Sequence, residues 1–287
     1  MHFLEILISG VLLGSLYALA ASGLSLGFGI MGIINLAHAE LIMLGAYVTF
    51  WLWSLAGVNP LLTILGSMIA LFAFSLIVYR VSIRKIIGEQ QLVSLILTYG
   101  ISIVLWNFAQ VAFTSTFRSV DFSAGTISVS GSHFPVNKIL SFAIVILAVV
   151  GLHLFLKYAG IGKSIRAVSQ NATIAAISGI NVERVRMIGF GIAGLLAGVA
   201  GSLIAIQWSI YPLMGEDLIL KCFAIVAIGG LGSLPGSLAG GIILGLAESI
   251  GTGYWDATMA NIFAPLLLIF TFLFRPQGLF GVAERVD

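Results

Sequence analysis

Long apolar runs, separated by short polar or glycine-rich stretches, cover almost the whole chain. A helix needs about 20 mostly apolar residues to cross a bilayer, and these runs are continuously apolar rather than alternating, which favours helices over a β-barrel. Residues 218–251 are short for two crossings and could instead form a re-entrant hairpin, so the pattern predicts eight or nine spans. The predicted helices cover residues 5–28, 37–56, 61–80, 92–113, 139–156, 187–208, 218–233, 236–251 and 260–274.

The composition strengthens this prediction. Hydrophobic residues make up 60% of the 287 positions and charged residues only 8%, against about 25% charged in soluble domains. We therefore expect an all-α integral membrane protein, a polytopic helical bundle with the lipid bilayer as its solvent. The net charge of +2 gives no reason to expect a nucleic-acid partner. The N-terminal apolar run has no preceding Lys or Arg, so it predicts a first membrane helix rather than a cleaved signal peptide.

Basic residues predict the orientation, because Lys and Arg accumulate in cytoplasmic loops. They gather in the loops 80–91 and 157–186 and near the C-terminus, whereas the opposite side holds only Arg118 and Lys138. These loops and the C-terminus are therefore predicted to be cytoplasmic, and the N-terminus outside. The basic residues on the predicted cytoplasmic side are Arg80, Arg84, Lys85, Lys157, Lys163, Arg166, Arg184, Arg186, Arg275 and Arg285.

Two glycine-rich segments suggest an internal direct repeat. Residues 29–45 and 229–245 share six identities in 17 positions, and both are predicted to turn at the cytoplasmic side. A single transmembrane domain, 1–287, would then contain a first repeat of about 1–90, a loop at 157–186, and a second repeat of about 187–287. Small residues four apart let helices pack closely, and Pro235 is expected to break any helix at its position. The predicted packing or hinge residues are Gly29, Gly32, Gly194, Gly198, Gly232, Pro235 and Gly236.

Ionisable residues inside membrane segments indicate function by default. Lys221 and Glu248 flank the turn near Gly232 at similar distances, so they could form a bracing ion pair or face a translocation path. Asn35, His38 and Glu40 are predicted at the cytoplasmic end of the second helix. There Asn35 could cap the helix and Glu40 could complement its dipole, or the group could gate the inner mouth of a pore.

Motifs for catalysis and cofactor binding are weak. The stretch "GLSLG" at 23–27 resembles a nucleophile elbow but lies inside a predicted membrane helix. The stretch "GIGKS" at 160–164 ends like a phosphate-binding loop, but Lys157 stands where the first glycine should be. His38 and Glu40 are two apart and point in different directions on a helix, which disfavours a metal site. We expect no enzyme activity, metal or cofactor in this chain.

The loop at 157–186 is too long for a simple turn. It predicts one or two short helices, with Asn171 as an N-cap and Gly179 as a stop signal. Small apolar residues between 172 and 177 lie next to basic ones, and a solvated loop has no need of such a surface. The loop is therefore predicted to dock a cytoplasmic partner.

Three sequence blocks resemble one family. They are "GIINLAHAELIMLGAY" (32–47), "GKSIRAVSQNATIAAISGINVERV" (162–185) and "KCFAIVAIGGLGSLPGSLAGGIILGLAES" (221–249), and the closing "RPQGLFG" (275–281) also fits. Over essentially its whole length the chain resembles a permease subunit of the branched-chain amino acid type of ABC importer, closest to the smaller of its two permeases. One departure is Ala39, where the family usually has Gly.

The resemblance implies a set of partners and a location. These are a second homologous permease, two cytoplasmic ATPase subunits that bind ATP and Mg²⁺, and an extracytoplasmic solute-binding protein, at the inner (plasma) membrane. The loop 162–185 would hold the coupling helix that contacts an ATPase, with Asn171, Ala175, Gly179 and Ile180 carried over as coupling residues.

Two other function classes compete with the importer. A stand-alone ion-coupled carrier would use Glu40, Lys221 and Glu248 as coupling groups, and an intramembrane enzyme would need a nucleophile–base pair that the sequence does not show. Related importers that carry urea or short amides leave the substrate open.

Overall fold

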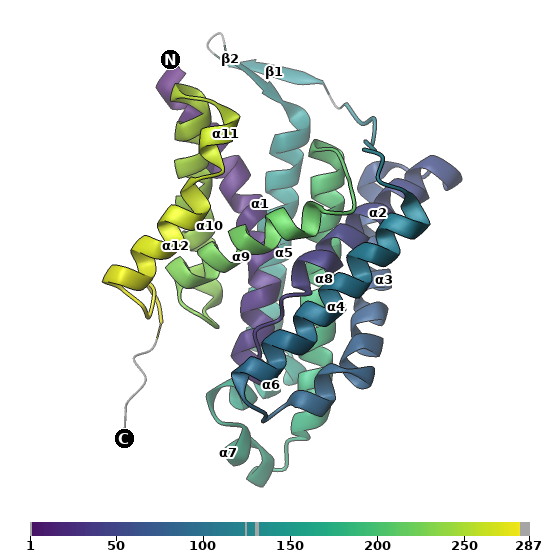
Figure 1. Ribbon diagram of the computed structural model, residues 1–287, viewed down its shortest axis with the longest axis vertical. Coiled ribbons are helices and arrows are strands. Elements are labelled where there is room, and N and C mark those ends of the chain that lie inside the picture. The colour runs from purple at the N-terminus through teal and green to yellow at the C-terminus, as the bar shows by residue number, and fades with distance from the viewer. Residues whose placement is uncertain (1, 124, 130–131, 282–287) are drawn as a thin grey trace.

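The computed structural model describes residues 2–123, 125–129 and 132–281, and these are almost entirely helical (Figure 1). All nine predicted segments form helices, which confirms the all-α membrane bundle. A short antiparallel hairpin, β1–β2, connects α4 to α5. The elements are α1 (His2–Met31), α2 (His38–Ala56), α3 (Pro60–Val81), the 3₁₀ turn η1 (Ile83–Ile86), α4 (Gln91–Phe113), β1 (Thr126–Val129), β2 (Ser132–Pro135), α5 (Val136–Tyr158), α6 (Gly160–Gln170), α7 (Ala172–Ile177), α8 (Val182–Gln207), α9 (Met214–Gly229), α10 (Leu234–Tyr254), α11 (Ala257–Ala260) and α12 (Phe263–Phe274).

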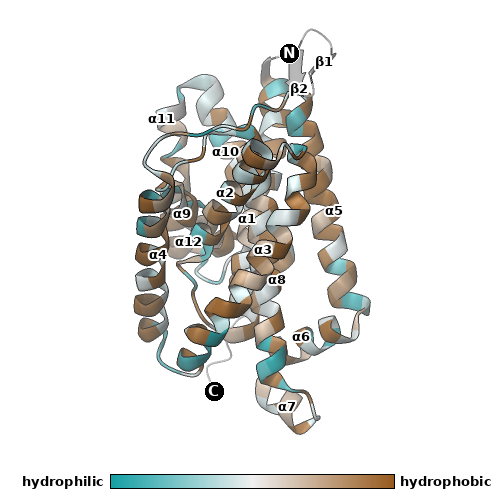
Figure 2. Cartoon of the chain, turned by 90° about the vertical axis from the view of Figure 1, so that its right-hand side faces the viewer, coloured by the Kyte–Doolittle hydropathy of each residue, from teal (hydrophilic) through white to brown (hydrophobic). Residues whose placement is uncertain are grey.

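Seven helices in the described part of the chain are long and apolar enough to cross a membrane: α1, α2, α3, α4, α5, α8 and α10. Helix α9 has 16 residues and α12 has 12, so at about 1.5 Å per residue both are shorter than a hydrocarbon core of about 30 Å. Figure 2 shows the long helices largely hydrophobic, with hydrophilic residues concentrated toward the two ends of the bundle. The N-terminus and the β1–β2 hairpin lie at one end, and α7 lies at the other (Figure 1).

Helix α8 forms the centre of the bundle. Its residues from Gly189 onward are almost all buried, and they pack mainly against α3, α2 and α1. The most extensive contact of α1 is with α10, which runs antiparallel along it. Gly194 and Gly198, expected to allow close packing, face the backbone of α3 near Leu71 and Ser67.

Adding one methyl group at Gly198 is expected to destabilise the bundle. A Cβ there would lie 2.7 Å from the Ser67 carbonyl oxygen and 3.0 Å from the Ser67 carbonyl carbon, so α3 and α8 would have to separate. Overpacking of this kind costs about 1–3 kcal/mol. Gly198→Ala should therefore lower the thermal unfolding midpoint of the purified protein. The control is Gly100→Ala on α4, where no atom lies within 4 Å of the added Cβ; equal midpoints for the two variants would contradict the prediction.

Candidate functional site

Helix α2 does not begin at the level where α1 ends. Its first residue, His38, is fully buried, and its Nε2 atom lies 3.0 Å from the carbonyl oxygen of Ala20, eleven residues before Met31 in α1. Eleven helical residues span about 17 Å, so residues 32–37 return along α1 into the bundle. Six extended residues can span about 20 Å, which is enough to cover this distance. The prediction that Asn35, His38 and Glu40 lie at the cytoplasmic end of a helix pair is therefore wrong.

The returning segment, residues 32–37, is held by specific backbone contacts. Gly32 adopts a φ of +67°, which starts the reversal after α1. The Thr98 hydroxyl of α4 donates to the Ile34 carbonyl at 3.1 Å and accepts from the Leu36 N–H at 3.2 Å. The Asn35 side chain accepts from the Ala37 N–H at 3.1 Å. The N-cap of α2 is Ala37, without a side-chain hydrogen bond, so the predicted capping of α2 by Asn35 is also wrong.

Glu40 lies at the middle of the bundle. The residue is 3% exposed, and its carboxylate accepts a hydrogen bond at 3.1 Å from Ser102, the central residue of α4. Its second oxygen, Oε2, has no hydrogen-bond partner among the described residues. A Cβ built on Gly215 would lie 2.5 Å from the Glu40 carboxyl carbon, so the carboxylate rests on the first turn of α9. Glu40 is thus near the positive N-terminal ends of both α2 and α9.

The first turn of α9 brings two more carboxylates to this depth. Glu216 and Asp217 directly follow Gly215, and both are exposed. Asp217 accepts a 2.5 Å hydrogen bond from the Tyr211 hydroxyl. Neither acid was predicted, because the helix expected from the sequence began at residue 218. Residues 218–251 are too short for two complete crossings, which indicates that one helix ends inside the membrane. That feature could have drawn attention to the acids just before residue 218.

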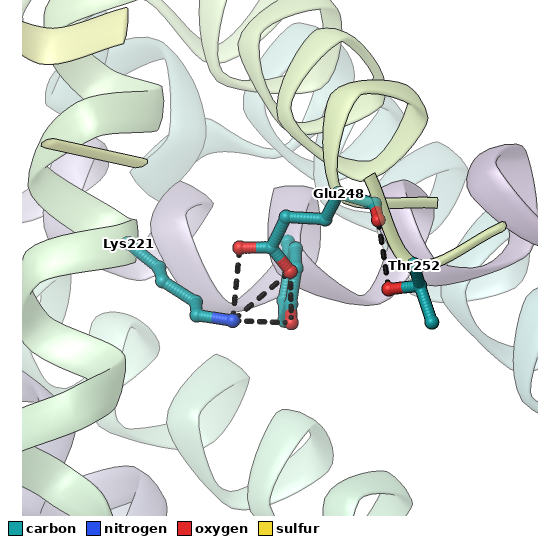
Figure 3. A network of polar contacts seen from close by, with 4 residues as sticks. Lys221, Glu248 and Thr252 are labelled. Atoms are coloured by element: carbon teal, nitrogen blue, oxygen red, sulfur yellow. Dashed lines mark hydrogen bonds and ion pairs between the residues drawn. The ribbon is translucent and has the colours of Figure 1, made fainter. Parts of the chain in front are cut away.

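A second polar group connects α1, α9 and α10 (Figure 3). The Lys221 ammonium lies 2.9 Å from Glu248 Oε1 and 3.0 Å from Oε2. The Tyr17 hydroxyl donates to Glu248 Oε2 at 2.9 Å and accepts from Lys221 at 2.9 Å. The Thr252 hydroxyl donates to the Glu248 backbone carbonyl, one turn along α10. Lys221 and Glu248 therefore form an ion pair, one of the two arrangements that the sequence left open.

The same lysine also lines an open cavity of about 580 Å³ between α8, α9 and α12. Its polar lining combines Lys221 and its neighbour Tyr17 with residues at and just before the first turn of α9, and Asn261 also lines it. These residues are Tyr17, Lys221, Tyr211, Glu216, Asp217 and Asn261. Lys221 and the acidic turn of α9 thus line the same cavity, so bracing and path-lining roles for Lys221 are compatible.

At the other end of α9, glycines bring the chain close to itself. A Cβ on Gly29 would lie 3.3 Å from the Gly232 carbonyl oxygen, and a Cβ on either Gly229 or Gly236 would lie 2.2 Å from the other's carbonyl oxygen. The expectation that Pro235 breaks a helix is wrong: it stands in the first turn of α10, where a proline removes no intrahelical hydrogen bond. The two segments of the suggested repeat therefore touch at Gly29 and Gly232, while the repeat itself stays a prediction.

The C-terminal residues 278–281 pack against this end of α9. The N–H groups of Leu279 and Phe280 donate to the carbonyls of Ile228 and Gly229 at 2.8 and 3.0 Å. Carbonyls in the last turn of a helix lack partners within the helix. Residues 278–281 supply two of these partners and fix the end of α9.

The loop predicted to dock a partner contains two helices, α6 and α7, as expected. The Asn171 side chain accepts from the Ile174 N–H at 2.9 Å and caps α7. Gly179 adopts a φ of +82°, and the Ile180 N–H bonds to the Ala175 carbonyl at 3.0 Å, so the helix ends in a Schellman motif. Ala175 is buried, whereas Ile174 and Ile177 are 62% and 83% exposed. The outer face of α7 is therefore apolar and open.

A family model described as "Branched-chain amino acid transport system / permease component" matches residues 6–272. The chain belongs to this family. Its members are transport permeases and not enzymes, and membership implies work with the other components of an ABC transport system, as a multi-pass membrane protein. In the described residues, no group of three or more His, Cys, Asp or Glu could hold a metal ion.

Relatives match along nearly the whole permease. The high-affinity branched-chain amino acid transport system permease protein BraD of Pseudomonas aeruginosa is 33% identical, with 99% of this chain and 97% of the relative covered. LivH of Escherichia coli is 31% identical with the same coverage, and a probable LivH of Methanocaldococcus jannaschii is 29% identical over 96% of this chain and 92% of its own. Among solved structures, a chain of PsaBC from Streptococcus pneumoniae shares the fold, with a TM-score of 0.51, 13% identity and coverage of 96% and 93%.

Proposed function

We propose that this permease forms part of the translocation path of an ATP-driven importer for branched-chain amino acids. The observation that carries the proposal is Glu216, exposed on the first turn of α9 at the depth of Glu40 and Ser102. A charged residue at the middle of a bilayer costs roughly 2.5–3.5 kcal/mol or more, and such residues face cavities or other protein. This face of α9 is therefore a wet surface or an interface between subunits.

The geometry suggests how the path is built. The non-helical segment 32–37 and the short helix α9 meet at Glu40. Non-helical backbone at membrane depth is tolerated only where it is buried in protein or lines a water-filled cavity. Glu40, Glu216 and Asp217 supply negative charge suited to the ammonium group of an amino acid. The substrate class is supported by the BraD and LivH relatives, whose names specify branched-chain amino acids. In this proposal Asn35 and His38 hold the segment that carries Glu40 in place, and they do not gate a cytoplasmic opening of the path.

The proposed partners rest on two observations: the resemblance of the chain to importer permeases and the exposed apolar face of α7. A second, homologous permease would cover the open side of the cavity, and an extracytoplasmic solute-binding protein would deliver substrate. Two cytoplasmic ATPase subunits would bind ATP and Mg²⁺ and contact Ile174 and Ile177, whose helix is shaped by Asn171, Ala175, Gly179 and Ile180. The protein would lie in the inner (plasma) membrane with the N-terminus outside and α7 in the cytoplasm, in agreement with the basic residues near α6 and α7.

The test is co-purification with the candidate ATPases. We expect the wild-type permease, expressed with its candidate partners, to retain the ATPases in detergent, and the variant Ile174→Ser/Ile177→Ser to lose them while staying monodisperse. Buried apolar anchors at an interface cost more than about 1–2 kcal/mol each when removed. The control is Leu92→Ser, an equally exposed apolar residue at the start of α4.

Two results would contradict the proposal. One is retention of the ATPases by the double variant at the wild-type level. The other is a wild-type chain that purifies alone and moves solute into liposomes without ATP, which would favour the ion-coupled carrier.

A further inference from the structure

A second cavity, of about 530 Å³, opens at the end of the bundle near α6. It lies between the end of α1, the end of α5, helix α6 and the turn that joins α9 to α10. Figure 2 shows α6 running across this end from the foot of α5. We call the cavity the basic pocket, after three of its lining residues: His153, Lys157 and Arg166.

The polar side of the basic pocket is suited to an anion. His153 and Lys157 are four residues apart on α5 and share a helix face. Arg166 of α6 donates to the Lys157 backbone carbonyl at 3.3 Å, which holds its guanidinium at the end of α5. Ser233 opposite them caps the 21-residue helix α10, so the positive end of that helix also faces the pocket. The lining residues, within the described part of the chain, include no Asp or Glu.

Much of the remaining wall is hydrocarbon. Leu26 and Ile30 of α1, Leu156 of α5 and Ile165 of α6 line the pocket beside the cations. A free phosphate or a nucleotide would gain nothing from these side chains, whereas a molecule with both an anionic head and an apolar body would contact both parts. Because α1 and α5 are membrane-spanning helices, the pocket lies at the boundary between the hydrocarbon core and the headgroups.

We propose that the basic pocket binds an anionic phospholipid of the leaflet next to α6, with its phosphate on Lys157 and Arg166 and its acyl chain along Leu26 and Ile30. Basic pockets between transmembrane helices are suited to such headgroups. The bound lipid would connect α5 and α6 to the α9–α10 turn. It would thereby fix the position of α6, the helix that directly precedes α7. This site does not depend on what the permease transports.

Native mass spectrometry of the purified permease tests the site, with phosphatidylglycerol and phosphatidylcholine added at equal concentration. We expect wild type to retain phosphatidylglycerol preferentially. Lys157→Gln/Arg166→Gln should weaken its binding roughly tenfold to thirtyfold, because each basic residue near an anionic surface contributes roughly a fivefold factor. The control is Lys85→Gln, an exposed basic residue of η1 on the same side of the bundle, which should bind like wild type.

Three outcomes would overturn the proposal. Equal binding of phosphatidylglycerol by wild type and the double variant would show that the pocket is not the site. Displacement of the lipid by millimolar inorganic phosphate would assign the pocket to a free anion. Unchanged lipid binding together with loss of ATPase co-purification in the double variant would assign Lys157 and Arg166 to a protein interface. Size-exclusion profiles and thermal midpoints equal to wild type show that each variant is folded.

Discussion

Replacing Lys221 with methionine is expected to prevent recovery of a stable permease. The Lys221 and Glu248 side chains are only 15% and 5% exposed, and Lys221 provides the only positive charge that the described structure places on Glu248. Removing one partner of a buried pair costs about 3–5 kcal/mol, because the other charge stays buried without compensation. The measurement is the yield of monodisperse protein and its thermal unfolding midpoint in detergent.

The double variant Lys221→Met/Glu248→Leu separates bracing from transport. Replacing both members of a buried pair by apolar residues is often neutral, so we expect the thermal midpoint to return toward that of wild type. If uptake returns with it, the pair only braces α9 against α1 and α10. If stability returns but uptake does not, Lys221 also acts in the path. A single variant Lys221→Met as stable as wild type would contradict the assignment of a buried pair.

Replacing Glu216 with leucine is expected to lower substrate uptake at least tenfold without lowering stability. Glu216 is exposed, and its side chain makes no hydrogen bond or ion pair among the described residues, so replacing it leaves no buried group unpaired. If the face met lipid, leucine would suit it better than a carboxylate, and uptake would stay unchanged. The measurement is ATP-dependent uptake of leucine by vesicles that contain the complete importer.

Glu89→Leu is the matched control for this experiment. Glu89 is an exposed carboxylate that lies in the connection between η1 and α4, away from the cavity at α9. Its replacement should leave uptake at the wild-type level. Normal uptake in Glu216→Leu, with equal amounts of assembled importer, would remove Glu216 from the path and weaken the proposal that rests on it.

The sequence predicted best what depends on local patterns. Continuous apolar runs located the long helices, and the cap at Asn171 and the stop at Gly179 were read from residue types with well-defined backbone preferences. The Lys221–Glu248 pair could be predicted from the sequence, because a short turn joins the two helices and the two residues lie at similar distances from that turn. Each of these features involves residues that are near in sequence or are connected by one turn.

The depth of Glu40 could not be predicted in this way. The glycine and polar residues of segment 32–37 are compatible with a surface turn and equally with a segment that returns into the bundle. The contacts that hold it inside the bundle come from Thr98 and Ser102 of α4. Those contacts join residues 62 or more positions apart. The partnership of Tyr17 with Glu248, 231 positions apart, is equally invisible in a local pattern.

The backbone bonds from Leu279 and Phe280 to the end of α9 have a consequence for membrane insertion. The two residues of each bond are 51 positions apart, from 228 to 279 and from 229 to 280, and α10, α11 and α12 lie between them. During synthesis α9 therefore leaves the ribosome before these two partners exist, and its last carbonyls gain them only after α10, α11 and α12 have been made. The C-terminal end of α9 is therefore completed only by residues that are made after all the other helices, so a chain cut before residue 278 would leave these two carbonyls without these partners.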